Sequence, residues 1–188
     1  MSRRRSFSVA RRVPYRRRRA LAIVLVLAAL VVVRLWQQGP SRAPPETLGE
    51  GTYHVERVVD GDTLLLANGA RVRLQGVDTP ETVKPNYPVE PFGPEATEFT
   101  RRFVAQGNGT VRLQFDRERL DKYGRFLAYV WVGDRMLNEE LVRAGLATAE
   151  LGYRYSSTMK TRFRRAEEEA KAAARGIWSS RAAASDGL

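Results

Sequence analysis

Cysteine is absent from this chain of 188 residues, and histidine occurs once, as His54. Without cysteine there is no disulfide, no thiolate metal site and no cysteine nucleophile. The single histidine excludes mechanisms that need a histidine pair and excludes a histidine-rich metal cage. A Ser-His-Asp triad would have to use His54, which we interpret as a structural residue because it lies at the start of the first predicted strand. The chemistry of this chain must therefore depend on carboxylates and arginines.

Acidic residues are absent from the first 43 positions, which contain eleven arginines. The whole chain has a formal net charge of +11, with 32 Lys and Arg against 21 Asp and Glu. Removing the eleven arginines leaves 21 basic residues against all 21 acidic ones, so residues 44–188 are formally neutral. Bulk charge therefore does not indicate a nucleic-acid partner for this part of the chain, and specific residues must carry any such inference.

A long apolar run follows the basic N-terminus. Ala20–Val33 contains fourteen consecutive apolar residues directly after four arginines. Such a run is typical of a signal-peptide core or, if it extends to Trp36, of a single membrane span. We favour an uncleaved anchor with its arginine side in the cytoplasm, because no small-residue cleavage site follows the run. Both alternatives place the rest of the chain outside the cytoplasm, either at the membrane or, after cleavage, secreted.

The remaining sequence predicts one folded domain. The predicted segments are a basic cytoplasmic tail (1–19), a transmembrane or signal-anchor segment (20–36), a proline-rich linker (37–50), the domain (51–178) and a C-terminal tail (179–188). With 43% apolar residues, the chain is large enough for a single hydrophobic core of ordinary size.

Apolar and β-branched runs predict five strands within the domain. Two tight turns, at Asp60–Gly61 and Asn68–Gly69, indicate that the first three strands form a meander. The five runs are Val55–Val59, Thr63–Ala67, Arg71–Gln75, Thr110–Phe115 and Phe126–Val132.

Three helices accompany these strands. The first begins near Pro94 and stops at Gly107. The second spans Glu139–Ala144 with Asn138 as its cap, and the third spans Met159–Arg175 with a solvated acidic and basic face. The pattern predicts an α+β fold, a five-stranded OB-fold β-barrel with three α-helices, preceded by the N-terminal hydrophobic helix.

Four carboxylates lie around one predicted hairpin. Asp60 and Asp62 stand before one of its strands, and Asp78 and Glu81 follow the other. The hairpin turn brings Asp62 and Asp78 to the same end of the sheet, because both lie at the strand ends remote from that turn. Two carboxylates brought together repel each other unless a cation lies between them. Oxygen ligands without histidine or cysteine favour Ca²⁺ or Mg²⁺ over zinc.

Arginines accompany these acids. Arg73 precedes Asp78 by five residues on what we predict to be the same strand, and an arginine fork beside a hard cation suits a phosphate group. Arg125 is predicted to supply a second fork from the opposite side of the barrel. A metal and two arginines around one phosphate are typical of phosphoryl-ester chemistry.

Five segments together resemble the staphylococcal nuclease (thermonuclease) family, in order and with nearly matching spacing. They are "VVDGDTLLL", "RLQGVDTPET", "FGPEATEFT", "DKYGRFLAYVW" and "LNEELVRAGLA". The resemblance covers about residues 51–178 and implies the OB barrel with three helices. It also implies a Ca²⁺-dependent endonuclease that acts on DNA and RNA and leaves 3′-phosphates. No protein partner is implied, and we expect a monomer.

The resemblance also implies roles for individual residues. Asp62 and Asp78 would be the side-chain calcium ligands, Thr79 would add its backbone carbonyl, and Glu81 would position or deprotonate the attacking water. Arg73 and Arg125 would hold the phosphate, and Arg125 would also stabilise the departing 5′ oxygen.

Four further residues are implied as substrate contacts. Lys122 and Tyr123 would contact a terminal phosphate, and the alternative is an ordinary solvated loop. Tyr153 and Tyr155 would stack on bases, and the alternative is packing at the rim of the barrel.

Two other functions compete with a nuclease. A non-catalytic OB module could bind nucleic acid or protein, and a membrane-tethered protein could act as a scaffold. We favour the enzyme, because a degraded copy would have little reason to retain both arginines together with Asp62, Asp78 and Glu81.

Overall fold

The computed structural model of this chain describes residues 44–82 and 90–179. The predicted basic tail, the predicted membrane segment and the predicted C-terminal tail from residue 180 onward lie outside these residues. Within the described ranges, no helix combines the length and the apolar character that a membrane crossing requires.

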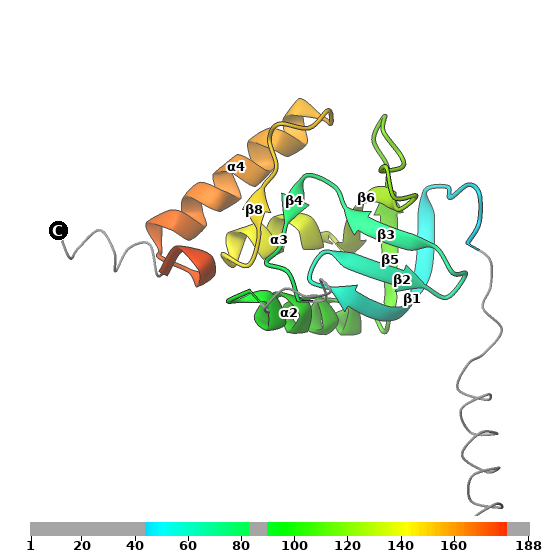
Figure 1. Cartoon of the computed structure of the whole chain (residues 1–188), viewed down its shortest axis with the longest axis horizontal. Helices are drawn as coiled ribbons and strands as arrows, with labels where there is room; N and C mark the ends of the chain where they lie inside the picture. The colour runs from blue at the N-terminus through cyan, green and yellow to red at the C-terminus, as the bar shows by residue number, and fades with distance from the viewer. Residues whose placement is uncertain (1–43, 83–89, 180–188) are drawn as a thin grey trace, which may run out of the picture. The chain divides into compact units, whose positions relative to one another are not determined.

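The described domain is a closed β-barrel with three α-helices, as predicted (Figure 1). The sheet runs in the order β3-β2-β1-β5-β6-β7, and a parallel pairing of β3 with β6 closes the barrel. The strands are β1 (Gly51–Asp60), β2 (Thr63–Leu66), β3 (Arg71–Leu74), β5 (Thr110–Gln114), β6 (Phe126–Val132) and the short β7 (Arg135–Met136). This closure aligns the starts of β3 and β6, two strands that are far apart in the sequence.

Local sequence explains the hairpin that carries the acids. Gly61 and Asp62 form the turn between β1, which ends at Asp60, and β2. At the other end, Asn68 accepts a hydrogen bond from the Ala70 amide (3.1 Å), and Gly69 takes a φ of 86°. Asn and Gly favour this turn because Asn bonds to nearby backbone and Gly tolerates positive φ. Both predicted turns are confirmed.

The helices cover the barrel and complete its core. They are α2 (Gly93–Gln106), α3 (Leu137–Arg143) and α4 (Ser157–Ala172), followed by a 3₁₀ turn, η1 (Gly176–Trp178). Helix α3 contacts both α4 and β6. Buried side chains from the sheet meet those from the helices in a single core, which includes Leu64, Val72, Phe103, Leu141 and Phe163.

Asn138 is not the cap of α3, contrary to the prediction. The helix begins two residues before the predicted Glu139, at Leu137, without a side-chain cap. The fully buried Asn138 side chain accepts from Val130 N (2.9 Å) and donates to the backbone oxygens of Gln75 (2.9 Å) and Ala128 (3.3 Å). These backbone groups are buried and need polar partners, so the Asn138 side chain serves them and does not cap the helix.

The predicted solvated face of α4 is exposed at Arg164, Arg165, Glu168 and Glu169, and only Glu167 is partly buried. Glu167 accepts a hydrogen bond from Ala149 N (2.9 Å), and Glu169 accepts one from Arg143 Nε (3.1 Å). These glutamates therefore link α4 to β8 and to α3.

The end of the predicted linker packs on the barrel. Leu48 is buried, and its carbonyl accepts a hydrogen bond from Arg119 Nη1 (3.2 Å). Glu50 accepts one from Phe115 N (3.1 Å). The chain is thus held against the β5–β6 connection before β1 begins.

A second, two-stranded sheet was not predicted. Its strands are β4 (Val77–Asp78) and β8 (Thr148–Ala149), which pair antiparallel. The prediction that Arg73 and Asp78 share one strand is therefore wrong, because β3 ends at Leu74 and the chain turns at Gln75–Gly76. Asp78 is placed by β8, about seventy positions further along the chain.

Candidate active site

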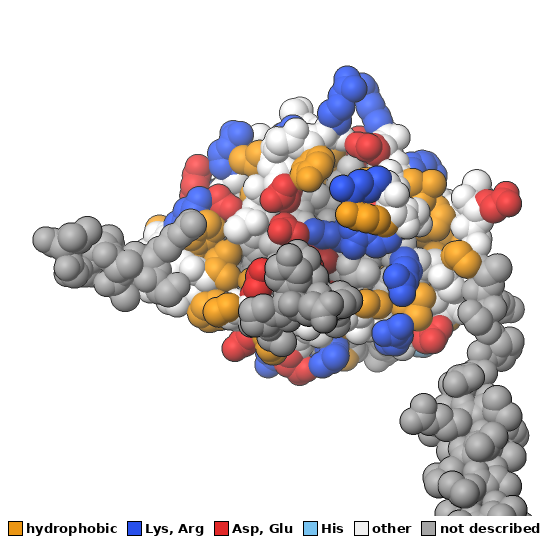
Figure 2. Space-filling model, in the orientation of Figure 1, with side chains coloured by type: hydrophobic (Ala, Val, Ile, Leu, Met, Phe, Trp, Pro, Cys, Tyr) orange, Lys and Arg blue, Asp and Glu red, His pale blue; other side chains and the backbone are white. Residues whose placement is uncertain are grey.

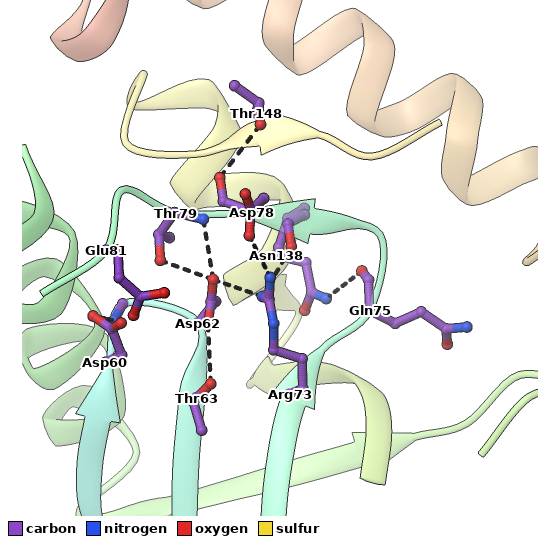
Figure 3. A network of polar contacts seen from close by, with 12 residues as sticks. Asp60, Asp62, Thr63, Arg73, Gln75, Asp78, Thr79, Glu81, Asn138 and Thr148 are labelled. Carbon is purple, nitrogen blue, oxygen red and sulfur yellow. Dashed lines mark hydrogen bonds and ion pairs between the residues drawn. The ribbon is translucent and has the colours of Figure 1, made fainter. Parts of the chain in front are cut away.

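Asp62 is a buried carboxylate with a full set of donors. It lies directly before β2, and only 6% of the residue is exposed. Its Oδ2 accepts hydrogen bonds from the amide (3.0 Å) and the hydroxyl (2.8 Å) of Thr79, and it lies 2.6 Å from Arg73 Nη1 (Figure 3). Thr79, which follows β4, therefore fixes the orientation of the carboxylate.

Asp78 approaches the same guanidinium from β4. Its Oδ1 lies 2.5 Å from Arg73 Nη2, and Arg73 Nη1 also donates to Val77 O (2.9 Å). The Asp78 side chain is 55% exposed, but the partial loss of surrounding water still raises its pKa. The positive charge of Arg73 acts to lower this pKa, and the negative charges of Asp62 and Glu90 raise it. The net pKa shift is upward, so negative charge is crowded at this end of the sheet.

These residues fit a hard cation. Carboxylates from two separate elements, Asp62 and Asp78, converge on one positive group, the Arg73 guanidinium. Oxygen donors of this kind suit Ca²⁺ or Mg²⁺. Among the described residues, no group of three or more His, Cys, Asp or Glu side chains is arranged as a metal site. Any ion held here would therefore need further oxygen ligands, from backbone carbonyls or from solvent.

Glu81 lies beside a second buried acid, Asp60. Asp60 Oδ1 accepts from Gly61 N (2.8 Å), Thr82 Oγ1 (2.6 Å) and Thr97 Oγ1 (3.3 Å). Burial raises the pKa of Glu81 most, and a hydrogen bond and repulsion from Asp60 add to the rise. Such a shift is what a carboxylate needs in order to act as a base nearer to neutral pH.

Arg125 lies directly before β6, the strand next to β3, and not on the opposite side of the barrel as predicted. Its Nε is 2.6 Å from Asp121 Oδ2, and Asp121 Oδ1 accepts from the amides of Tyr123 and Arg125 (both 2.9 Å). Burial acts to raise the pKa of Asp121, but hydrogen bonds from Arg125 and Tyr123 lower it overall. A charged Asp121 thus orients the guanidinium of Arg125.

One cavity of about 530 Å³ brings most of the predicted residues together. Its lining includes Arg73, Asp78, Lys122, Tyr123, Arg125 and Tyr153. Figure 2 shows basic and acidic side chains next to one another on the face that carries β3 and β4. The cavity thus places the predicted residues Arg73, Arg125 and Asp78 around a single space.

Tyr153 and Tyr155 differ in their surroundings. Tyr153 is 65% exposed and lines the cavity. Tyr155 packs its ring 6.1 Å from that of Phe163, and burial followed by the charge of Glu150 raises its pKa to about 12. It lines a neighbouring cavity of about 880 Å³, which contains none of the predicted catalytic residues. Tyr155 is therefore not brought to the other substrate-binding candidates.

Comparison with known proteins identifies the family. The family model "Staphylococcal nuclease homologue" matches residues 71–180. The thermonuclease of Staphylococcus hyicus is 42% identical over 164 residues, which cover 84% of this chain and 95% of that protein. The chain belongs to the staphylococcal nuclease family. The thermonuclease of Staphylococcus intermedius is 44% identical over 162 residues, covering 82% of this chain and 95% of the relative. Endonuclease YncB of Bacillus subtilis is 41% identical over 129 residues, which cover 66% of this chain and 60% of that protein.

In this member of the staphylococcal nuclease family, two acids to which the sequence interpretation gave no role contact predicted site residues. Asp60 contacts Glu81 and is held by two threonines. Its signal in the sequence was its place in the Asp-Gly-Asp turn. Asp121 orients Arg125, and its signal was the spacing of four residues between the two, which allows an acid and an arginine to meet across a tight turn.

Proposed function

We propose that this chain is a calcium-dependent endonuclease that hydrolyses phosphodiester bonds of DNA and RNA by in-line attack of water and leaves 3′-phosphate ends. Its relatives carry the names thermonuclease and endonuclease, and this chain is a nuclease enzyme. The observation that best supports the finer proposal is the convergence of Asp62 and Asp78 on one cationic group beside a cavity that also holds Arg125.

Asp62 and Asp78 would hold the calcium ion, with the backbone carbonyl of Thr79 as a third ligand. Bound calcium would neutralise charge on the scissile phosphate. The donors on Asp62 support this role, because the Thr79 amide and hydroxyl fix the direction of that carboxylate.

Glu81 acts as the general base in this proposal. It takes a proton from the attacking water as the oxygen of that water bonds to phosphorus. Its raised pKa and its place beside Asp60 support the assignment, because a carboxylate among other negative charges accepts a proton more readily.

Arg73 and Arg125 bind the phosphate, and Arg125 stabilises the 5′ oxygen as its bond to phosphorus breaks. A guanidinium offers paired donors to phosphate oxygens. Lys122 and Tyr123 contact a terminal phosphate, and Tyr153 stacks on a base. The exposure of Tyr153 and Tyr123, 65% and 72%, supports their availability to a substrate.

We also propose that the domain acts outside the cytoplasm, as a monomer at the membrane or as a secreted enzyme. The basic and apolar residues 1–36 support this placement. A non-catalytic binding module is not favoured, because Asp62, Asp78, Glu81, Arg73 and Arg125 are all retained.

The test is digestion of single-stranded DNA by the purified full-length chain with Ca²⁺ and with a chelator. We expect cleavage only with Ca²⁺, with 3′-phosphate ends. Asp62→Asn should raise the calcium concentration needed for activity, because it removes one unit of ligand charge. Glu81→Gln should lower the rate on the order of 10² to 10⁴ with little change in calcium affinity.

Glu95→Gln is the matched control, since Glu95 is exposed on α2 and lines neither of the two cavities described above. Equal activity with Zn²⁺ and none with Ca²⁺ would contradict the metal assignment. Full activity of Glu81→Gln would contradict the proposed base.

A further inference from the structure

Glu81 and Glu90 form a reciprocal backbone and side-chain pair. The Glu81 amide donates to Glu90 Oε2 (3.1 Å), and the Glu90 amide donates to the Glu81 carbonyl (3.0 Å). Within the described part of the chain, Glu90 is the partner of both backbone polar groups of Glu81. The main chain from which the proposed base projects is thus held by one residue.

Glu90 is itself held by the start of helix α2. Its carbonyl accepts a hydrogen bond from Gly93 N (3.1 Å), the first residue of α2. The pair is therefore connected to a helix of fourteen residues that packs on the barrel. A residue attached to rigid structure can hold a neighbouring segment in one position.

The packing around Gly93 brings α2 directly against the segment that carries Glu81. A Cβ atom at Gly93 would lie 2.6 Å from Thr82 Cγ2 and 3.0 Å from the Pro80 carbonyl oxygen. Thr97, one turn further along α2, donates to Asp60 (3.3 Å), the acid beside Glu81. The start of α2 thus contacts both the backbone and the carboxylate neighbour of the proposed base.

We propose that Glu90 is a positioning residue for hydrolysis, and that it acts through Glu81 by fixing the main chain from which the base projects. This proposal rests on the proposed function, in which Glu81 accepts the proton of the attacking water. Glu90 does not line the cavity that holds Arg73 and Arg125, so a direct contact with the phosphate is not part of its role.

The carboxylate of Glu90 supplies a hydrogen-bond acceptor and a negative charge, and substitutions can separate the two. Glutamine keeps an acceptor oxygen at the same distance from the main chain and loses the charge. Alanine removes both. If the hydrogen bond to the Glu81 amide matters, Glu90→Gln should keep most of the activity and Glu90→Ala should not.

The experiment compares kcat and KM of the full-length chain on single-stranded DNA at saturating Ca²⁺. Glu90→Ala should lower kcat on the order of 10 to 10²-fold, because a small displacement of a catalytic group has effects of this size. KM should change less than threefold, and Glu90→Gln should restore kcat to within about threefold of the parent. Glu95→Ala, an exposed acid near the start of the same helix, should match the parent.

A double-substitution cycle separates positioning from general destabilisation. With the base already removed by Glu81→Gln, adding Glu90→Ala should cost less than about threefold, because the two residues act as one unit. Melting temperatures confirm that each variant is folded at the assay temperature. Independent losses that multiply in the double variant would overturn the proposal, and so would a Glu90→Ala variant with normal kcat.

The two proposals fail in different ways. If Glu81→Gln has normal kcat, the assignment of the base fails first. If Glu81→Gln is strongly impaired while Glu90→Ala is not, the base stands and only the positioning role of Glu90 is overturned.

Discussion

Arg73 Nη1 lies 2.6 Å from Asp62 Oδ2, and both groups are largely buried. The same guanidinium contacts Asp78 through Nη2. Arg73 and a divalent cation are thus attracted by the same two carboxylates, and the positive charge of one opposes the approach of the other.

Arg73→Gln should therefore bind Ca²⁺ several-fold more tightly than the parent when no nucleic acid is present, while its cleavage rate falls. Removing the guanidinium leaves the charges of Asp62 and Asp78 uncompensated, which favours the cation. Titration calorimetry at fixed ionic strength measures the affinity. Arg71→Gln, an exposed arginine on the same strand, is the control. Weaker calcium binding by Arg73→Gln would show instead that the arginine is needed to arrange the two carboxylates.

Arg125→Lys should lower kcat on the order of 10²-fold while KM changes much less. Lysine keeps the charge, but it cannot hold Asp121 and present paired donors to a phosphate at the same time. Steady-state kinetics on single-stranded DNA checks this. Arg117→Lys, an exposed arginine on the same connection, should behave as the parent. An equal loss of kcat in Arg125→Lys and Arg117→Lys would contradict the proposed role of Arg125.

Asn138→Ala should lower the free energy of unfolding by about 2 to 4 kcal/mol. The substitution leaves two buried groups, Val130 N and the carbonyl of Gln75, without the partner that Asn138 provides. Urea denaturation measures the change. In Asn68→Ala, which loses one hydrogen bond at a partly exposed turn, the change should stay within about 1 kcal/mol. Similar losses in both variants would mean that burial of the amide is not decisive.

Asp116 predicts a specific pH dependence of stability. Its carboxylate accepts from Tyr129 Oη (2.9 Å), Ser156 N (2.6 Å) and Arg117 N (2.8 Å). Burial acts to raise its pKa, but these hydrogen bonds lower it below the ordinary value of 3.8. A pKa lower in the folded than in the unfolded state stabilises the fold above pH 3.8, and this gain is lost as the pH falls through the folded pKa.

Asp116→Asn should therefore be less stable than the parent at pH 7, and the difference should shrink as the pH falls below about 4. Denaturant titrations at several pH values between 7 and 3 measure it. Asp134→Asn, an exposed acid in the β6–β7 turn, should track the parent throughout. A constant difference at all pH values would mean that the charge of Asp116 contributes nothing.

Features that depend on neighbouring residues could be predicted from the sequence. The turns at Asp60–Gly61 and Asn68–Gly69, and alternating strands such as Thr110–Gln114, follow from local backbone preferences and from the period of two residues. These features were enough to place Asp62 and Asp78 at one end of a hairpin and to predict a barrel.

Only the tertiary structure decided which distant groups meet. The pairing of Val77 with Ala149 separates Asp78 from the strand of Arg73 and still returns it to the same guanidinium. The partners of Asn138 and the pair formed by Glu81 and Glu90 likewise join residues that no local pattern relates. Turn preferences and side-chain periods act over a few residues, whereas these contacts arise because polar groups of the main chain and side chains find distant partners once the barrel and its helices have packed.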